Sequence, residues 1–205
     1  MADDTLTITT SIPFRLDRLP WAKWHWTIVV ALGITWILDG LEVTIVGSLN
    51  PTLASREGLG FSDVQAGYGA TAYLIGAVCG SLGFGVLTDR FARRRLFLVT
   101  LGWYLVSTVL TAFAWNFWSF ALFRVFAGMG IGGEYSAVNS AIDELIPAAR
   151  RGVTDIAING SWWIGTLIGA LASIPLLSGR FFPPSLGWRL AFGLGAVLAL
   201  CVVFL

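Results

Sequence analysis

The stretch RVFAGMGIGGEYSAVNSAIDELIPAARRG, from Arg124 to Gly152, decides the fold of this chain. It begins with a lone arginine inside an apolar run and carries several glycines before it reaches Glu134. A charge inside an uncharged span costs roughly 2.5–3.5 kcal/mol on insertion scales, so such residues face protein or water and usually carry function. Gly128 and Gly132 are spaced so that another helix backbone can approach closely. The stretch therefore predicts a tightly packed transmembrane helix that carries charge into a cavity and ends in a charged loop.

Composition places the whole chain in the membrane class. Hydrophobic residues make up 56% of the sequence and charged residues 12%, whereas a typical soluble domain carries about 25% charged residues. The mean hydropathy of +0.77 points the same way. The net charge of +1 gives no reason to expect nucleic acid as a partner. Cys79 and Cys201 lie in apolar runs without the spacing of metal ligands, so neither a metal site nor a cofactor is expected.

Six apolar runs follow a polar lead, and each approaches the ~20 residues that a helix needs to cross a bilayer. A soluble helical core is the alternative, but uninterrupted runs of this length argue against it. The sequence predicts an all-α membrane protein with a cytoplasmic N-terminal segment, 1–23, and a six-helix unit, 24–205, that ends within its sixth helix. The expected spans are Thr27–Leu49, Ala66–Leu87, Leu96–Ala114, Phe117–Ser140, Val153–Leu177 and Trp188–Leu205.

The positive charges outside the spans set the expected orientation. With the N-terminus inside, the inner segments hold more of these charges than the outer segments do. We therefore expect a multi-pass protein of the inner or plasma membrane, surrounded by lipid, with a cytoplasmic N-terminus. The inner set comprises Arg15, Arg18, Lys23, Arg90, Arg93, Arg94, Arg95, Arg150 and Arg151, and the outer set comprises Arg56, Arg180 and Arg189.

Two acids lie within the first span, in TWILDGLEVTIVG. Asp39 and Glu42 are three residues apart and so share a helix face. Burying even one carboxylate is costly, which favours a functional role for the pair over a packing role. Arg124 is the only cation in the interior of an expected span, since Arg189 stands at the very start of the sixth, and we expect Arg124 to oppose Asp39. With Glu134, these residues form the expected buried set for proton coupling and substrate binding.

Two further helix faces are marked by residue type, whereas the third span shows only structural features. In the fifth span, Asn159 and Trp162 lie on a polar and aromatic stripe, which is explained either as a cavity lining or as helix packing. Small residues at helical spacing mark the second and fourth spans as close-packing helices. The expected packing glycines are Gly76, Gly80, Gly128 and Gly132.

Several stretches resemble the major facilitator superfamily of transporters. GVLTDRFARR, from Gly85 to Arg94, resembles the signature G-x-L-x-D-R-x-G-R-R between the second and third helices, with Ala92 in place of the family glycine. RVFAGMGIGGE resembles the fourth helix of the sugar-porter and metabolite:proton symporter branches, and ELIPAARRG resembles the inner loop after it. GWR, from position 187, resembles the entry to helix six, and the acid pair is similar to the D-G-x-D/E pattern of organic-anion symporters.

The resemblance implies a transporter made of two six-helix halves around a central site, of which this chain supplies one. The second half would come from the same longer chain or from another copy. The resemblance also implies an inner conformational gate that does not contact substrate, although by charge alone the arginine cluster is also explained as a topological anchor. The expected gate residues are Gly85, Asp89, Arg90, Arg93, Arg94, Glu144 and Arg151.

Three functions are compatible with these features. The first is a secondary transporter that moves a small organic acid or sugar by alternating access, coupled to protons. The second is a proton-independent facilitator of the same fold, and the third is a truncated half that does not transport. An enzyme is not expected, because the sequence has no G-x-S-x-G, no second histidine and no cluster of metal ligands. Arg124 favours a carboxylate substrate, whereas Asn159 and Trp162 suit a sugar or an aromatic ring.

Overall fold

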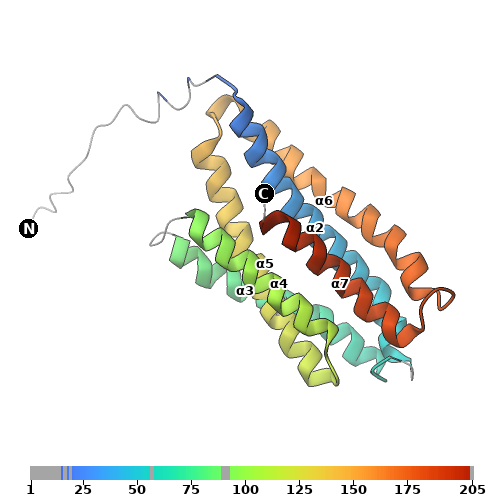
Figure 1. Ribbon diagram of the computed structural model, residues 1–205. Helices are drawn as coiled ribbons and strands as arrows, with labels where there is room; N and C mark the ends of the chain where they lie inside the picture. Colours follow the sequence, from blue (N-terminus) through green and yellow to red (C-terminus); the bar gives the residue numbers. More distant parts are fainter. Residues whose placement is uncertain (1–14, 16–17, 19, 56–57, 89–92, 204–205) are drawn as a thin grey trace, which may run out of the picture.

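The computed structural model is an all-α bundle that describes residues 15, 18, 20–55, 58–88 and 93–203. Its long helices, shown in Figure 1, are α2 (Lys23–Ala54), α3 (Asp63–Thr88), α4 (Arg93–Ala112), α5 (Phe117–Leu145), α6 (Ala148–Leu177) and α7 (Pro184–Val203). Among the described residues, four helices are long and apolar enough to cross a membrane, namely α2, α3, α4 and α6. The predicted fold class, an all-α membrane protein with six helices, is confirmed.

The sequence predicted that the helix carrying Glu134 ends in a charged loop, and this prediction is wrong. Helix α5 continues to Leu145 and α6 begins at Ala148, so Arg150 and Arg151 are helical. Hydropathy marks only the part of a helix that lies in lipid, whereas alanine, glutamate and arginine are good helix formers in water as well. The helical conformation is interrupted only at the two residues before α6. Pro147 has no backbone N–H to donate and is the N-cap residue of α6.

Side-chain caps explain where two other helices begin. Ser62 and Gln65 form a capping box before α3, in which the Ser62 N–H donates to Gln65 Oε1 at 3.0 Å and the Gln65 N–H donates to Ser62 Oγ at 3.2 Å. Before α5, Asn116 Oδ1 accepts a hydrogen bond from the Ser119 N–H at 2.8 Å. These bonds satisfy backbone donors that have no partner within the helix.

Helix α7 is tied to the end of α4 by an arginine. The Arg189 guanidinium donates to the carbonyl oxygens of Ala112 and Ala114, just where α4 ends. A cation suits this position because the last carbonyls of a helix lack partners and carry partial negative charge. Next to it, Trp188 is 1% exposed and packs edge-on against Phe192 in the core. The first turns of α7 therefore attach this helix to the end of α4 and to the core.

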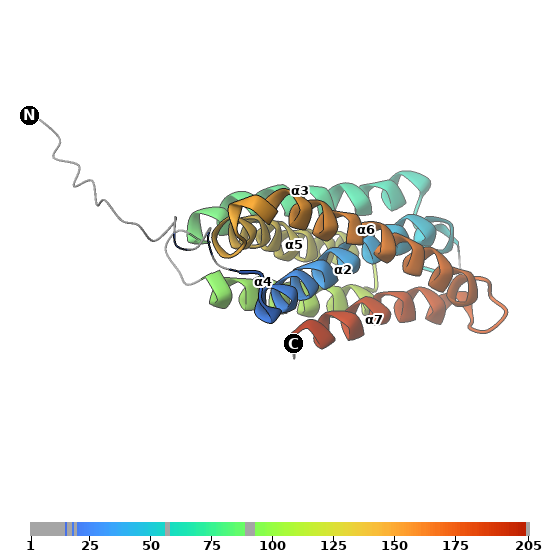
Figure 2. The ribbon, with the colours of Figure 1, turned by 90° about the horizontal axis from the view of Figure 1, so that it is seen from above.

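The two central helices of the bundle are α2 and α5. Seen from above, α3 and α6 lie along one side of them and α4 and α7 along the other (Figure 2). Helix α2 packs on α6 and α7, and α5 packs on α3 and α4. In the most apolar stretch of α2, 50% is buried inside the bundle, whereas only 17% is buried in the corresponding stretches of α3 and α6. The flanking helices α3 and α6 thus expose apolar faces that need lipid or another protein surface to cover them.

Glycines let neighbouring helices touch backbone to backbone. At each of the packing glycines of α3 and α5, an added Cβ would overlap a backbone carbonyl oxygen of the other helix, so only glycine fits. Gly40 and Gly165 do the same where α2 crosses α6. The glycines at the contact between α3 and α5 are Gly76, Gly80, Gly128 and Gly132.

Gly80→Ala should lower the stability of the bundle by about 1–3 kcal/mol, the usual cost of overpacking, because its methyl group meets the backbone of Met129. Gly83 on the same helix is the matched control, since a Cβ there meets nothing within 4 Å. Gly83→Ala should be neutral or slightly stabilising, because alanine is the better helix former. Thermal unfolding of the purified chain in detergent measures both. Equal melting of the two variants would contradict the close contact of α3 and α5.

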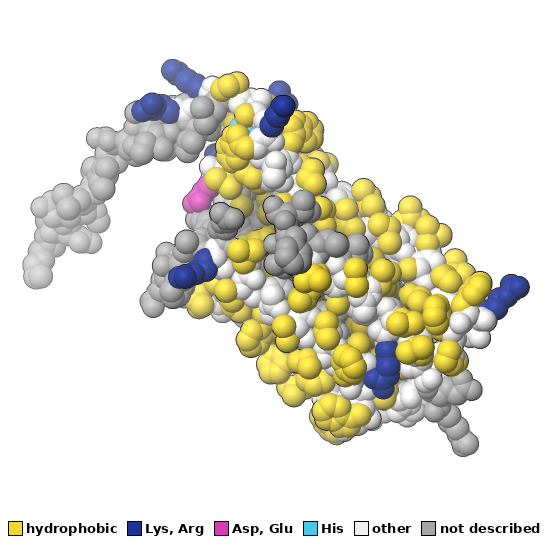
Figure 3. Space-filling view, in the orientation of Figure 1, with side chains coloured by type: hydrophobic (Ala, Val, Ile, Leu, Met, Phe, Trp, Pro, Cys, Tyr) yellow, Lys and Arg dark blue, Asp and Glu magenta, His cyan; other side chains and the backbone are white. Residues whose placement is uncertain are grey.

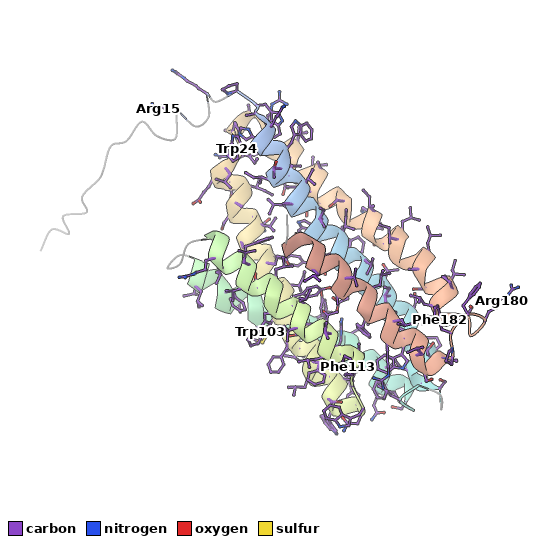
Figure 4. The ribbon with its side chains drawn as sticks, viewed as in Figure 1. Arg15, Trp24, Trp103, Phe113, Arg180 and Phe182 are labelled. Carbon is purple, nitrogen blue, oxygen red and sulfur yellow. The ribbon has the colours of Figure 1, made fainter. Side chains whose placement is uncertain are left out.

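The surface has the pattern of a membrane protein. In Figure 3, hydrophobic side chains cover the length of the bundle, while lysine and arginine side chains gather near its ends. Figure 4 places Arg15 and Trp24 at the end where α2 begins, and Arg180 and Phe182 at the opposite end. Cationic and aromatic side chains at both ends of an apolar belt match the two interfaces of a bilayer.

Candidate functional site

The acids of the first span lie in the buried middle of the bundle. Asp39 is 3% exposed and Glu42 is 2% exposed, and both come from α2. Arg124 of α5 is 1% exposed and forms an ion pair with Glu42, to which its Nη1 donates. The Tyr104 hydroxyl of α4 donates to the other oxygen of Glu42. Glu42 thus has one charged and one neutral donor, and the expected pairing of Arg124 with Asp39 is replaced by a pairing with Glu42.

Asp39 is held by three neutral donors from three different helices. Its Oδ1 accepts from the Tyr73 hydroxyl of α3 at 2.9 Å. Its Oδ2 accepts from the Tyr135 hydroxyl of α5 at 2.6 Å and from Trp162 Nε1 of α6 at 2.9 Å. Hydrogen bonds of this kind stabilise a carboxylate without cancelling its charge. Asp39 therefore connects α2 to the two flanking helices and to α5.

The guanidinium of Arg124 is packed between rings. Its Cζ lies 4.2 Å from the centre of the Tyr73 ring and 5.8 Å from that of Phe192. Both distances allow an attraction between the cation and the ring face. Its Nε is buried and has no hydrogen-bond partner among the described residues. One donor of this buried cation is therefore unsatisfied in this conformation, which is costly.

Glu134 lies apart from the ion pair. It is 1% exposed on α5, and its Oε1 is buried without a hydrogen-bond partner among the described residues. Its polar neighbours are Thr35 and Asp39 of α2, which lie one helical turn apart on one face. The structure thus places Glu134 beside the site but does not bring it to Arg124.

The polar stripe of α6 divides into two parts. Trp162 reaches Asp39, as described above, whereas Asn159 is exposed and its Nδ2 donates to the Oδ1 and the carbonyl oxygen of Asp155, each at 2.9 Å. A separate hollow of about 320 Å³ between α5 and α6 is lined by polar side chains. Those side chains include Asn139, Asp143, Arg151 and Asp155. Asn159 is therefore bonded to a residue that lines this hollow and not to the buried acids.

Only part of the expected gate is described. Asp89 and Arg90 lie outside the described residues, and so do the side chains of Arg93 and Arg94. Gly85 is half-buried near Ser136, and Glu144 is exposed near the end of α5. Arg151 Nε donates to the carbonyl oxygen of Ile146 at 2.9 Å. The role of these residues as a gate stays a prediction.

Sequence reasoning missed the tyrosines of the site. Three of the four tyrosines in the chain donate to the buried acids, namely Tyr73, Tyr104 and Tyr135. The third span, in which the sequence shows only structural features, supplies Tyr104 of α4 to this set. A signal was present, since a tyrosine inside an apolar span usually finds a partner for its hydroxyl.

Tyr104→Phe should destabilise the bundle by about 1–3 kcal/mol, because Glu42 loses a donor and a buried acceptor is left less satisfied. Tyr68→Phe is the control, since Tyr68 is 56% exposed on α3. Thermal unfolding of both variants in detergent makes the comparison. A Tyr104→Phe protein that melts like the Tyr68→Phe protein would show that the Tyr104 hydroxyl adds nothing to the site.

Comparison with known proteins supplies the family context. The family described as sugar (and other) transporter matches residues 26–205. The niacin transporter NiaP of Acinetobacter baylyi is 32% identical over 188 residues, covering 92% of this chain and 41% of that protein. The inward open xylose transporter XylE from E. coli matches with a TM-score of 0.74 at 19% identity, covering 87% of this chain and 46% of that chain.

A crystal structure of a D-xylose-proton symporter gives a TM-score of 0.78 at 19% identity, covering 89% of this chain and 47% of that one. At such identities the likeness concerns the fold alone. The chain spans less than half the length of each of these proteins.

Proposed function

Because this chain belongs to the sugar (and other) transporter family, within the major facilitator superfamily, we propose that it supplies the N-terminal half of a proton-coupled secondary transporter. The transporter moves a small organic solute by alternating access. A second six-helix half, from the same longer chain or from another copy, completes the pathway around a central site. The protein lies in the inner or plasma membrane with its N-terminus in the cytoplasm, as the distribution of arginines favours.

The observation that carries this proposal is the charge of the buried site. Arg124 compensates Glu42, and Asp39 is left with three neutral donors and no cation among the described residues. A buried carboxylate without a counter-ion is held only while its donors stay in place. When a change between outward and inward states moves α3 or α6, Asp39 loses donors and takes up a proton. The site thereby binds a proton in one state and releases it in the other.

The same site explains how an anionic substrate follows the proton. Arg124 has a free Nε in the described site, and its Nη1 is engaged by Glu42. The carboxylate of the substrate competes with Glu42 for the guanidinium, which can bind a carboxylate with two parallel hydrogen bonds. The relative from Acinetobacter baylyi is named for niacin, a carboxylic acid on an aromatic ring, which favours an organic acid over a sugar here. Proton and anion then enter together.

The second half covers the side of the bundle that α3 and α6 flank. Tyr73 of α3 and Trp162 of α6 approach Asp39 from that side, and both helices expose most of their apolar surface. Movement of the second half against these faces is thereby transmitted to the donors of Asp39. The gate residues at the inner end, including Asp89 and Arg151, hold one of the two states through charge-assisted contacts.

Uptake of radiolabelled niacin by proteoliposomes that contain the complete protein tests the proposal. An imposed gradient that is alkaline inside should drive accumulation, and a protonophore should remove it. Unlabelled D-xylose serves as a competitor, and competition by D-xylose alone would favour a sugar substrate. Uptake that ignores the gradient would replace the proposal with a facilitator. An absence of flux for both solutes would favour a half that does not transport.

A further inference from the structure

We propose that Glu134 is a second proton-binding group of the site, which holds its proton in the conformation seen here while Asp39 is the anion. Its use in transport rests on the function proposed above, whereas its protonated state does not. The proton passes between two carboxyl groups: the O–H bond of Glu134 breaks, and an O–H bond forms on Asp39. Glu134 then becomes the carboxylate and Asp39 the neutral acid.

The first argument comes from burial. Glu134 is 1% exposed, and its Oε1 is buried without a hydrogen-bond partner among the described residues. A buried carboxylate that lacks donors is costly, whereas the neutral acid carries no charge to compensate.

The second argument comes from the charges around Glu134. Among the described side chains no cation lies against it, and Arg124 is already paired with Glu42. The atoms nearest to a Cβ placed on the neighbouring Gly133 belong to Phe84 of α3 and Thr100 of α4, and neither side chain is charged. Asp39 is the neighbouring titratable group from α2. An ionised Glu134 would thus add a second uncompensated charge to a buried site, which is costly.

The third argument is that Asp39 is equipped as the anion. The indole N–H of Trp162 can only donate, so Asp39 Oδ2 must accept from it. The Tyr73 hydroxyl occupies the other oxygen, and the Tyr135 hydroxyl adds a bond to Oδ2. Glu134, by contrast, has no partner for its Oε1 in the part of the chain that the structure describes. The tyrosine and tryptophan donors of the site thus surround Asp39 and not Glu134.

The placement along the bundle suits a proton relay. Thr35 precedes Asp39 by one turn of α2 and so lies nearer the end where α2 begins. Glu134 faces that turn from α5, on the side that leads to Leu145. In the proposed orientation this is the cytoplasmic side. Glu134 is therefore placed on the side of Asp39 from which a proton would leave toward the cytoplasm.

Infrared spectroscopy of the purified chain in lipid vesicles at neutral pH tests the protonated state directly. The carbonyl stretch of a buried, protonated carboxylic acid should be present in the wild type and lost in Glu134→Gln. It should remain in Asp39→Asn and in Asp63→Asn, an acid in the exposed first turn of α3. Glutamine resembles the neutral acid, so the variant should fold. Loss of the band in Asp39→Asn instead, or its absence from the wild type, would overturn the inference.

Labelling with a hydrophobic carbodiimide gives a second measurement that needs no variant. Such reagents add to protonated carboxyl groups in apolar surroundings, and mass spectrometry should find the adduct on Glu134. An adduct on Asp39 alone would overturn the inference. Uptake by the complete protein separates the two proposals, since a protonated Glu134 together with uptake that ignores a pH gradient would contradict the coupling and leave the protonation of Glu134 standing.

Discussion

Arg124→Ala should lower the free energy of unfolding by about 3–5 kcal/mol, the cost of breaking a buried ion pair from one side. The arginine is 1% exposed and is the partner of Glu42, so its removal leaves a carboxylate buried with only the Tyr104 hydroxyl as donor. The cavity left by the side chain adds to the loss. In the complete protein the variant should also lose both accumulation and exchange of substrate. Chemical unfolding in mixed detergent measures the stability.

A second substitution separates charge from packing. Glu42→Gln removes the uncompensated charge, so the double variant Arg124→Ala/Glu42→Gln should recover part of the stability that Arg124→Ala loses. Arg180→Ala, in the exposed segment after α6, is the control and should change stability by no more than about 0.5 kcal/mol. Simple addition of the two single effects in the double variant would show that Arg124 and Glu42 do not interact.

The architecture was predictable because lipid imposes one requirement on the sequence. A helix that crosses a bilayer needs a long apolar run, and the six runs predicted the six helices with their order. Their ends were not predictable from the same signal. The segments around Lys23 and Arg150 are helical in spite of their charge, since helix propensity does not end where lipid ends.

The site was predictable by composition but not by pairing. Charges inside apolar runs identified Asp39, Glu42 and Arg124 as buried, and all three are. Which acid meets the arginine depends on the rotation and height of α5 against α2, and neither is encoded in the spacing along one helix. For the same reason the sequence did not identify Tyr104 as a partner of Glu42, because a tyrosine in an apolar run does not show which helix its side chain faces. Glycine spacing indicated a close contact without naming the partner.

Asp39→Asn in the complete protein should abolish accumulation of substrate against a gradient while exchange of substrate continues. The amide cannot exchange a proton with its surroundings, so the coupling step is lost, but a similar shape still fills the space. The donors of the site can adapt to the amide. The asparagine carbonyl oxygen can take the place of Oδ2 and accept from the Trp162 indole, and its NH₂ then takes the place of Oδ1, where the Tyr73 hydroxyl can accept instead of donate.

The melting temperature of the Asp39→Asn protein separates stability from coupling. It should stay close to that of the wild type, while accumulation is absent. Asp63→Asn, in the exposed first turn of α3, should leave both properties unchanged. The assay is uptake into proteoliposomes with and without an imposed pH gradient, with counterflow as the measure of exchange. If the Asp39→Asn protein still concentrates substrate, the coupling proton does not pass through Asp39, and the remaining buried acids, Glu42 and Glu134, become the groups that carry it.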